Sequence, residues 1–358
     1  MKLLDKYISK RFWQFFLFAI FTFVIIFLVV DIVENLDYYI DHKAKGTDVL
    51  TYYFYYIPYI IVLVTPIGTL LAAAFLGGFL VKNHELVAIR SSGISSRKIA
   101  MLLLMWGFAI SIVVFFAGEL VIPRTNSMRD EIKRVLIAKQ SDTSGRMRND
   151  LFYICTNGMV IYFRTFDIQR KVAKDVILHR YENGMLTERI DAKTMRWQES
   201  RWIAQNAIKR TFAGMNEKVE LFTQLDLNIT ELPDDFARKN PSPEEMGFWE
   251  LRRFIQKAIG SGVIPSREQT DLWMKLAYPL VNLIVLMLGI PLSFKIRKGS
   301  YIYGFGQSFF VAFIYLGILR AGQTFGYNAT LSPALAAFAG DLIFFSIGAI
   351  LLMRMEKV

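Results

Sequence analysis

The sequence predicts an α-helical integral membrane protein in which a β domain is inserted between two groups of three transmembrane helices. Two observations carry this prediction. Hydrophobic residues make up 54% of the 358 residues and the mean hydropathy is +0.34, values too apolar for an ordinary soluble protein. Apolar segments of bilayer-spanning length lie near both ends of the chain, whereas the middle carries charged runs and Asn-Gly pairs typical of β-hairpins.

The charge and the cysteine usage narrow the class of protein further. The net charge is +11, but much of it lies beside the apolar segments, so it indicates membrane-flanking basic residues rather than a nucleic-acid partner. Cys155 is the single cysteine, which excludes an intramolecular disulfide and a multi-cysteine metal site. We expect Cys155 to pack as a small apolar residue.

Residues 1–123 are predicted to form three transmembrane helices. The apolar run 12–30 follows a basic start, but it is too long for a signal peptide and lacks a small-residue cleavage site, so we interpret it as a retained helix. The second helix covers 51–81, and Gly77 would allow close packing near its inner end. The third covers about 99–122 and is expected to end at Pro123, because proline interrupts helices.

A short polar segment, NHELVAIRSSGISSRK, joins the second and third predicted helices. Its apolar positions Leu86 and Ile89 recur at near-helical spacing, and Gly93 can end a helix in a left-handed conformation. The segment therefore predicts a short helix at about 83–94, lying across the inner face of the membrane. The alternative is a structured loop that only positions the two neighbouring helices.

Residues 124–269 are predicted to form the extramembrane domain, in which a charged helix precedes the strands. Asn157-Gly158 and Asn183-Gly184 each separate two apolar runs, which is a strong hairpin signal. With the runs that follow, they predict a β-meander or sandwich of at least six strands. Ile161, Phe163 and Thr165 share one face of the run 159–166. An amphipathic helix is expected at Phe248–Gly260.

Residues 270–358 are predicted to form three further transmembrane helices, at 272–294, about 302–325 and 331–353. Basic residues follow or precede the helices at each predicted inner connection. Because positively charged residues favour the cytoplasmic side, we expect both termini in the cytoplasm and the β domain outside.

The sequence carries little catalytic chemistry. It contains neither the phosphate-binding motif G-x-x-x-x-G-K-[ST] nor the zinc motif H-E-x-x-H, and its three histidines are widely scattered. We therefore expect no enzyme active site, metal or cofactor in this chain.

Three charged residues lie within the apolar segments and are candidate functional residues. Asp341 is near the middle of the last predicted helix, so it should face protein or a wet cavity. Glu119 and Arg320 lie near the outer ends of the third and fifth helices. They can extend to the interface or pair with each other.

Several motifs resemble those of the lipopolysaccharide-transport permease family LptF/LptG (YjgP/YjgQ). They are ELVAIRSSGIS at 85–95, GELVIP at 118–123 and YPLVNLIVLMLGIPLSF at 278–294, in a chain with the order three helices, β domain, three helices. The resemblance covers essentially the whole length. The opening LDKYISK and the ending LSPALAAF…LLMR are more similar to the LptG type than to LptF.

The resemblance implies a permease subunit of an ATP-driven ABC transporter in the inner membrane of a Gram-negative bacterium. Such a permease pairs with an LptF-like permease above an LptB-type ATPase dimer, which holds the ATP and Mg. The complex extracts lipopolysaccharide from the membrane and passes it along β-jellyroll domains to an LptC/LptA-like periplasmic bridge.

The same resemblance implies roles for particular residues. The short helix becomes a coupling helix that contacts the ATPase through Glu85, Leu86, Ile89 and Arg90. Cations at the outer boundary, Arg320, Arg124, Lys43 and Lys45, are candidates for contact with lipid phosphates, and Ile161 and Phe163 for contact with acyl chains. The acidic residues Asp31, Glu34 and Asp37 depart from the family, whose members tend to carry lysines there.

Three other functions are compatible with the sequence. The chain could be a permease for another lipid or lipoprotein, a secondary transporter that uses Asp341 as a proton site, or a membrane scaffold for the β domain. The lack of a visible inverted repeat weakens the secondary-transporter interpretation.

Overall fold

The structure is a computed structural model that describes residues 2–137, 147–155, 159–182, 185–213, 216–237, 243–260, 265–294 and 301–355. It divides into two compact units, a helical unit of residues 1–130 and 266–358 and a second unit of residues 131–265. The boundaries expected from the sequence were 123/124 and 269/270, and this division falls at 130/131 and 265/266.

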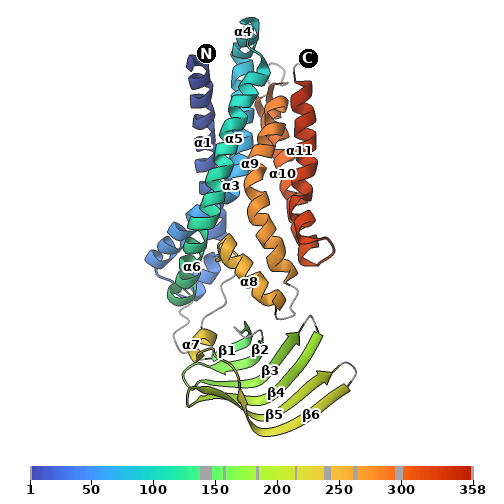
Figure 1. Ribbon diagram of the computed structural model, residues 1–358. Helices are drawn as coiled ribbons and strands as arrows, with labels where there is room; N and C mark the ends of the chain where they lie inside the picture. The colour runs from blue at the N-terminus through green and yellow to red at the C-terminus, as the bar shows by residue number, and fades with distance from the viewer. Residues whose placement is uncertain are drawn as a thin grey trace. The chain divides into compact units, whose positions relative to one another are not determined.

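Six helices of the described chain are long and apolar enough to cross a membrane, as predicted (Figure 1). Five are α1 (Lys2–Glu34), α3 (Gly46–Lys82), α9 (Ser266–Phe294), α10 (Tyr301–Tyr327) and α11 (Pro333–Arg354), and the sixth starts as α5 (Ser96–Phe116). Two short helices, α2 (Leu36–Asp41) and α4 (Glu85–Ser91), lie between them in sequence.

The third long helix does not end at Pro123, and that prediction is wrong. From α5 the chain continues as the π-helical turn η1 (Ala117–Val121), α6 (Ile122–Ile132) and a second π-helical turn η2 (Lys133–Ile137). Proline lacks a backbone donor and clashes with the carbonyl four residues earlier. The π-helical turn η1 ends two residues before Pro123 and includes Glu119, the residue four positions before it, so the changed hydrogen-bond spacing allows the helix to continue past the proline.

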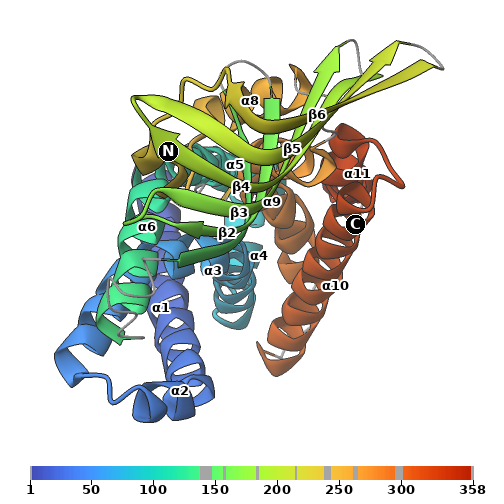
Figure 2. The same ribbon diagram turned by 90° about the horizontal axis from the view of Figure 1, so that it is seen from below.

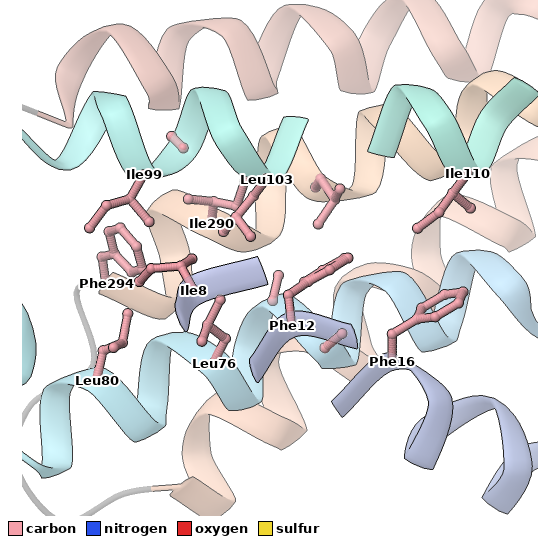
Figure 3. Packing of buried hydrophobic residues seen from close by; sticks show 14 of the residues in the cluster. Ile8, Phe12, Phe16, Leu76, Leu80, Ile99, Leu103, Ile110, Ile290 and Phe294 are labelled. Carbon is pink, nitrogen blue, oxygen red and sulfur yellow. The ribbon is translucent and has the colours of Figure 1, made fainter. Parts of the chain in front are cut away.

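One core cluster of the helical unit lies where α1 begins and α11 ends. Figure 3 shows Ile8 and Phe12 of α1 packed among side chains of α3, α5 and α9. Phe12 is fully buried. At Gly77 an added Cβ would lie 2.3 Å from the Ser293 Oγ, so α3 and α9 pack at a distance that only glycine permits. This confirms the close packing expected at Gly77.

The described residues of the second unit form one antiparallel sheet of six strands, in which each strand pairs with the next one in the sequence. The strands are β1 (Met147–Ile154), β2 (Met159–Asp167), β3 (Val172–Glu182), β4 (Met185–Gln198), β5 (Arg201–Ala213) and β6 (Asn216–Leu227). Figure 2 shows the described strands as one curved sheet, and their order is that of the predicted β-meander, not of the alternative sandwich. The all-β domain is confirmed, whereas both Asn-Gly turns lie outside the described residues. Helix α8 (Phe248–Gly260) has the predicted bounds.

A line of unpaired positions, which we call the crease, crosses the sheet. In the pairing of every two neighbouring strands, one pair of opposing residues along this line is missing. The pair of Arg164 with Asp175 is skipped, and the interruption continues through Asn206 on β5. Asp175 and Asn206 adopt left-handed backbone angles, with φ of 49° and 51°. The predicted alternation therefore fails at Thr165, since Phe166, not Thr165, is fully buried with Phe163.

Candidate functional site

The predicted coupling segment forms a helix and not only a loop. Helix α4 (Glu85–Ser91) begins after His84, whose φ is 59°, and ends before Gly93, whose φ is 80°. The start of α1, the end of α11 and α4 lie at the same end of the helical unit, which we call the terminal end (Figure 1).

The side chains of α4 divide into an anchoring set and an outward set. Leu86 is only 3% exposed and belongs to the core cluster with Ile8, so it fixes the helix to its own chain and offers little surface to a partner. Arg90 is exposed, and its Nε donates to the Ser96 Oγ at 2.8 Å. Val87 is 61% exposed and was not among the predicted contact residues. Its apolar side chain, next to the buried Leu86, was the available signal in the sequence.

The carboxylate of Glu85 is held by the first helix. The hydroxyl of Tyr7 lies 3.1 Å from Oε1 and 3.0 Å from Oε2 of Glu85, so it donates to this carboxylate. The guanidinium of Arg11 lies 5.5 Å from the centre of the Tyr7 ring and 4.8 Å from that of Phe79. Tyr7 was missed by sequence reasoning, since 78 positions separate it from Glu85 and no motif connects them.

Arg320 is part of a polar network on α10 and α9. Its NH1 donates to the Gln323 Oε1 at 2.9 Å. The Gln323 amide in turn donates to the Asp271 Oδ1 at 3.2 Å and to the Tyr327 hydroxyl at 2.7 Å, and Tyr327 donates to Asp271. Arg320 is exposed but oriented by its own helix, while Glu119, its predicted alternative partner, lies on η1.

The other predicted cations lie on separate elements. Lys43 and Lys45 are exposed in the connection between α2 and α3, and Arg124 is exposed on α6. One of the acidic residues that depart from the family has a structural contact. Asp31 accepts a hydrogen bond from the Tyr53 hydroxyl at 2.7 Å, which ties the end of α1 to α3.

Asp341 faces protein, as expected. It is 4% exposed on α11, and the Tyr315 hydroxyl of α10 lies 2.5 Å from its Oδ1. Its Oδ2 is buried and makes no hydrogen bond with the described residues. The pair therefore connects α10 to α11 within the apolar part of the unit.

The predicted acyl-chain residues lie in the core of the β domain. Ile161 and Phe163 are both fully buried. Phe236 of the short helix α7 (Pro233–Ala237) packs against them, with its ring centre 5.1 Å from that of Phe163 and 5.3 Å from that of Trp202. The chain itself thus fills this part of the apolar face of the sheet.

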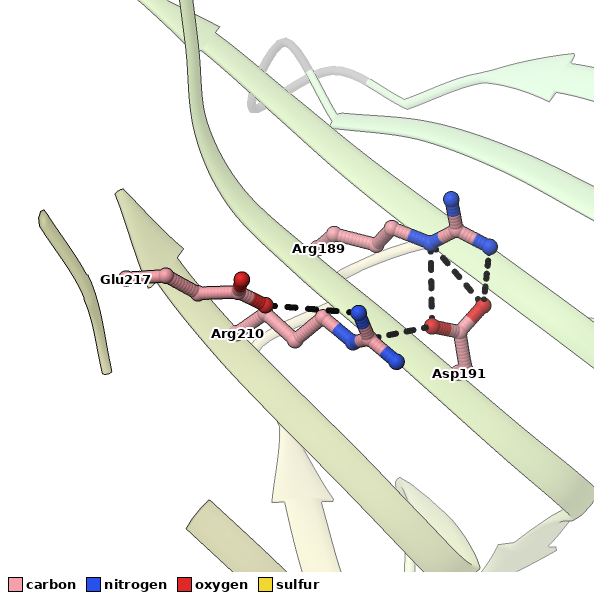
Figure 4. Close-up of polar contacts among 4 residues, drawn as sticks. All are labelled: Arg189, Asp191, Arg210 and Glu217. Carbon is pink, nitrogen blue, oxygen red and sulfur yellow. Dashed lines mark hydrogen bonds and ion pairs between the residues drawn. The ribbon is translucent and has the colours of Figure 1, made fainter. Parts of the chain in front are cut away.

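Charged side chains are concentrated on neighbouring strands of the same domain. Figure 4 shows Asp191 between Arg189 and Arg210. The Asp191 carboxylate lies 2.8 Å from NH2 of Arg189 and 3.9 Å from Nε of Arg210, and NH1 of Arg210 lies 3.3 Å from Oε1 of Glu217. The hydrogen bonds that the Arg189 guanidinium donates to the Asp191 carboxylate raise the pKa of Arg189. Nearby, burial and then the positive charge of Arg189 lower the pKa of His179.

These features define a class of protein. The chain is a multi-pass helical membrane protein with an inserted β domain, and its described residues include no cluster of three or more His, Cys, Asp or Glu side chains that could hold a metal ion.

Comparison with known proteins identifies the family. The family model "Lipopolysaccharide export system permease LptF/LptG" matches residues 6–354, so the chain belongs to this family. The chain is 21% identical to the lipopolysaccharide export system permease protein LptG of Escherichia coli K12 over 98% of both chains. The LptG protein of Escherichia coli O6:H1 matches with the same identity and coverage. The names of both relatives agree with the predicted LptG-like character.

Proposed function

We propose that this chain is the permease subunit of an ABC transporter that uses ATP to extract lipopolysaccharide from the bacterial inner membrane and deliver it to a periplasmic bridge. The single observation that best supports this function is the geometry of α4. This helix presents Glu85 and Val87 at the terminal end of the helical unit, in a chain of the lipopolysaccharide export family. In this proposal both termini and α4 are cytoplasmic, and the β domain is periplasmic.

An LptB-type ATPase dimer binds α4 and supplies ATP hydrolysis with its own ATP and Mg. The Glu85 carboxylate accepts hydrogen bonds from an arginine of the ATPase, beside Val87, Ile89 and Arg90. A hydrogen bond to a charged group contributes about 1.5–3 kcal/mol, which is enough to determine whether the subunits stay associated. Leu86 supports the contact indirectly, because its burial fixes the position of α4.

The lipid is held by cations and apolar side chains. Arg320 is the leading candidate for a phosphate contact, because its guanidinium is exposed, planar and oriented by Gln323. Arg124, Lys43 and Lys45 add positive charge. Acyl chains then pass along the apolar face of the sheet near Ile161 and Phe163, which requires α7 to move because Phe236 covers that face. An LptF-like permease and an LptC/LptA-like bridge complete the transporter.

A proton-coupled transporter is the second candidate function, favoured by the buried and unbonded Oδ2 of Asp341. The variant Asp341→Asn separates the two functions. It retains the shape of the side chain and accepts from Tyr315, but it cannot cycle a proton. ATP-driven transport is expected to survive this change, whereas proton-driven transport would stop.

The ATPase contact is tested by purifying the permease from its native membrane and identifying the ATPase and the lipid that accompany it. Glu85→Lys should lose the ATPase while the permease still folds. Glu199→Lys, at an exposed turn of the β domain, is the matched charge-reversal control and should retain it. Normal association and transport in Glu85→Lys would contradict the proposal.

A further inference from the structure

Helix α1 is attached to the helical unit mainly through its first half. Ile8 and Phe12 are at most 1% exposed, whereas Leu17, Phe21 and Val33 are 60–66% exposed. Only 11% of its most hydrophobic window is buried. Apart from the hydrogen bond from Tyr53 to Asp31 near its end, α1 is held to its own chain mainly by these contacts near its start, so we expect a change in those contacts to be transmitted along the helix.

Polar contacts at this half of α1 reach three other helices. Trp106 of α5 donates to the Ser9 Oγ at 2.9 Å, and Arg11 stacks on Phe79 of α3. The hydroxyl of Tyr7 donates to Glu85 of α4. The Tyr7 contact is different from the other two, because its acceptor is the carboxylate assigned to the ATPase.

We infer that Tyr7 is a positioning residue that orients the Glu85 carboxylate for the ATPase and links movement of α4 to α1. This inference rests on the proposed function. A carboxylate offers about four lone-pair sites and Tyr7 has one proton to donate, so Glu85 can accept from Tyr7 and from an arginine at the same time. The hydroxyl also limits the rotamers of a long, partly exposed side chain before the ATPase binds.

The mechanical consequence follows from the packing. Leu86 fixes the inward face of α4 in the same cluster as Ile8 and Phe12 of α1. When the ATPase moves α4 through Glu85, Tyr7 and this apolar contact displace the start of α1 in the same direction. Without the hydroxyl, only the nondirectional apolar contact remains, and ATP hydrolysis is less well coupled to movement of α1.

The test compares Tyr7→Phe with wild type in the complete transporter, reconstituted with its LptB-type ATPase and lipopolysaccharide. The substitution retains the ring that packs against Arg11 and removes only the donor. Tyr55→Phe removes a hydroxyl from α3 and is the matched control. We expect the lipid released per ATP hydrolysed to fall about threefold or more in Tyr7→Phe, with thermal stability unchanged, since hydrogen bonds to charged groups are among the stronger ones. Tyr55→Phe should match wild type.

The double variant Tyr7→Phe/Glu85→Ala shows whether Tyr7 acts through Glu85. We expect the double variant to behave like Glu85→Ala alone, because the acceptor is already absent. If Tyr7→Phe leaves lipid per ATP unchanged while Glu85→Lys still loses the ATPase, the inference is wrong and the proposed function stands. If Glu85→Lys has no effect, the proposed function itself fails. A loss of thermal stability in Tyr7→Phe with unchanged lipid per ATP in the folded complexes would assign Tyr7 a purely structural role.

Discussion

Phe236→Ala is the substitution that most directly tests the core of the β domain. The Phe236 side chain is fully buried, and its ring centre lies 4.8 Å from that of Tyr153 as well as near those of Phe163 and Trp202. Truncating a buried phenylalanine to alanine destabilises a protein by about 3–5 kcal/mol. Because whole domains are stable by only ~5–15 kcal/mol, the β domain should lose a large share of its free energy of unfolding.

The lone cysteine provides the assay in the full-length protein. Cys155 is 2% exposed in the same cluster as Phe236, and burial raises the pKa of its thiol, so a maleimide should react only when the domain opens. A loss of about 3–5 kcal/mol corresponds to roughly two to four orders of magnitude in the open population and in the labelling rate. Leu221→Ala, at a side chain that is 78% exposed, is the control and should change little.

Adding lipopolysaccharide to the same labelling experiment tests whether acyl chains bind in the β domain. If acyl chains use the apolar face covered by Phe236, lipid should fill the space left in Phe236→Ala and slow the labelling of Cys155 in that variant. Protection by lipid would support an acyl-chain path beneath α7, whereas rapid labelling regardless of lipid would favour an ordinary core. An unchanged labelling rate in Phe236→Ala without lipid would refute the assigned packing.

Three further predictions concern pH, lipid phosphate and topology. Burial and the charge of Arg189 lower the pKa of His179 below its usual 6.5, so the unfolded state binds a proton on His179 more readily than the folded state does. The β domain should therefore lose stability as the pH falls below 6.5, and His179→Gln should reduce that loss in thermal unfolding. Arg320→Ala should lose lipid binding while its thermal stability stays nearly intact, and Glu119→Ala should retain lipid binding. If both single variants lose stability, the double variant loses little more, and lipid binding is unchanged, Arg320 and Glu119 are instead a structural pair. Cysteines at Ser92 and Glu199 should react with a membrane-impermeant reagent from opposite sides, and labelling from one side would contradict the topology.

Hydrophobic length and turn chemistry made most of the fold predictable. The six transmembrane helices and helix α8 follow from apolar runs and helical periodicity. The continuation through Pro123 was not predictable, because it depends on a π-helical turn that propensity rules do not indicate. The crease was also missed, since Asp175 and Asn206 adopt left-handed angles that only the assembled sheet requires.

Only those parts of the candidate site that depend on the local sequence pattern were predictable. The spacing of Leu86 and Ile89 indicated helix α4, but the same spacing could not show which of them is buried. The contact of Tyr7 with Glu85 depends on packing between helices that are distant in sequence. The hydrogen bond from Gln323 to Asp271 also joins residues that are distant in sequence. It orients Gln323, which in turn accepts a hydrogen bond from Arg320.

ATP-driven release of lipopolysaccharide from proteoliposomes tests the central claim most directly. The vesicles would contain this permease, an LptF-like permease and the LptB-type ATPase, with an LptC/LptA-like bridge protein added as acceptor. We predict transfer of lipopolysaccharide to the bridge protein only when ATP is hydrolysed, retained in Asp341→Asn and lost in Glu85→Lys. Transfer that needs no ATP, or that persists in Glu85→Lys, would contradict an ATPase-coupled permease.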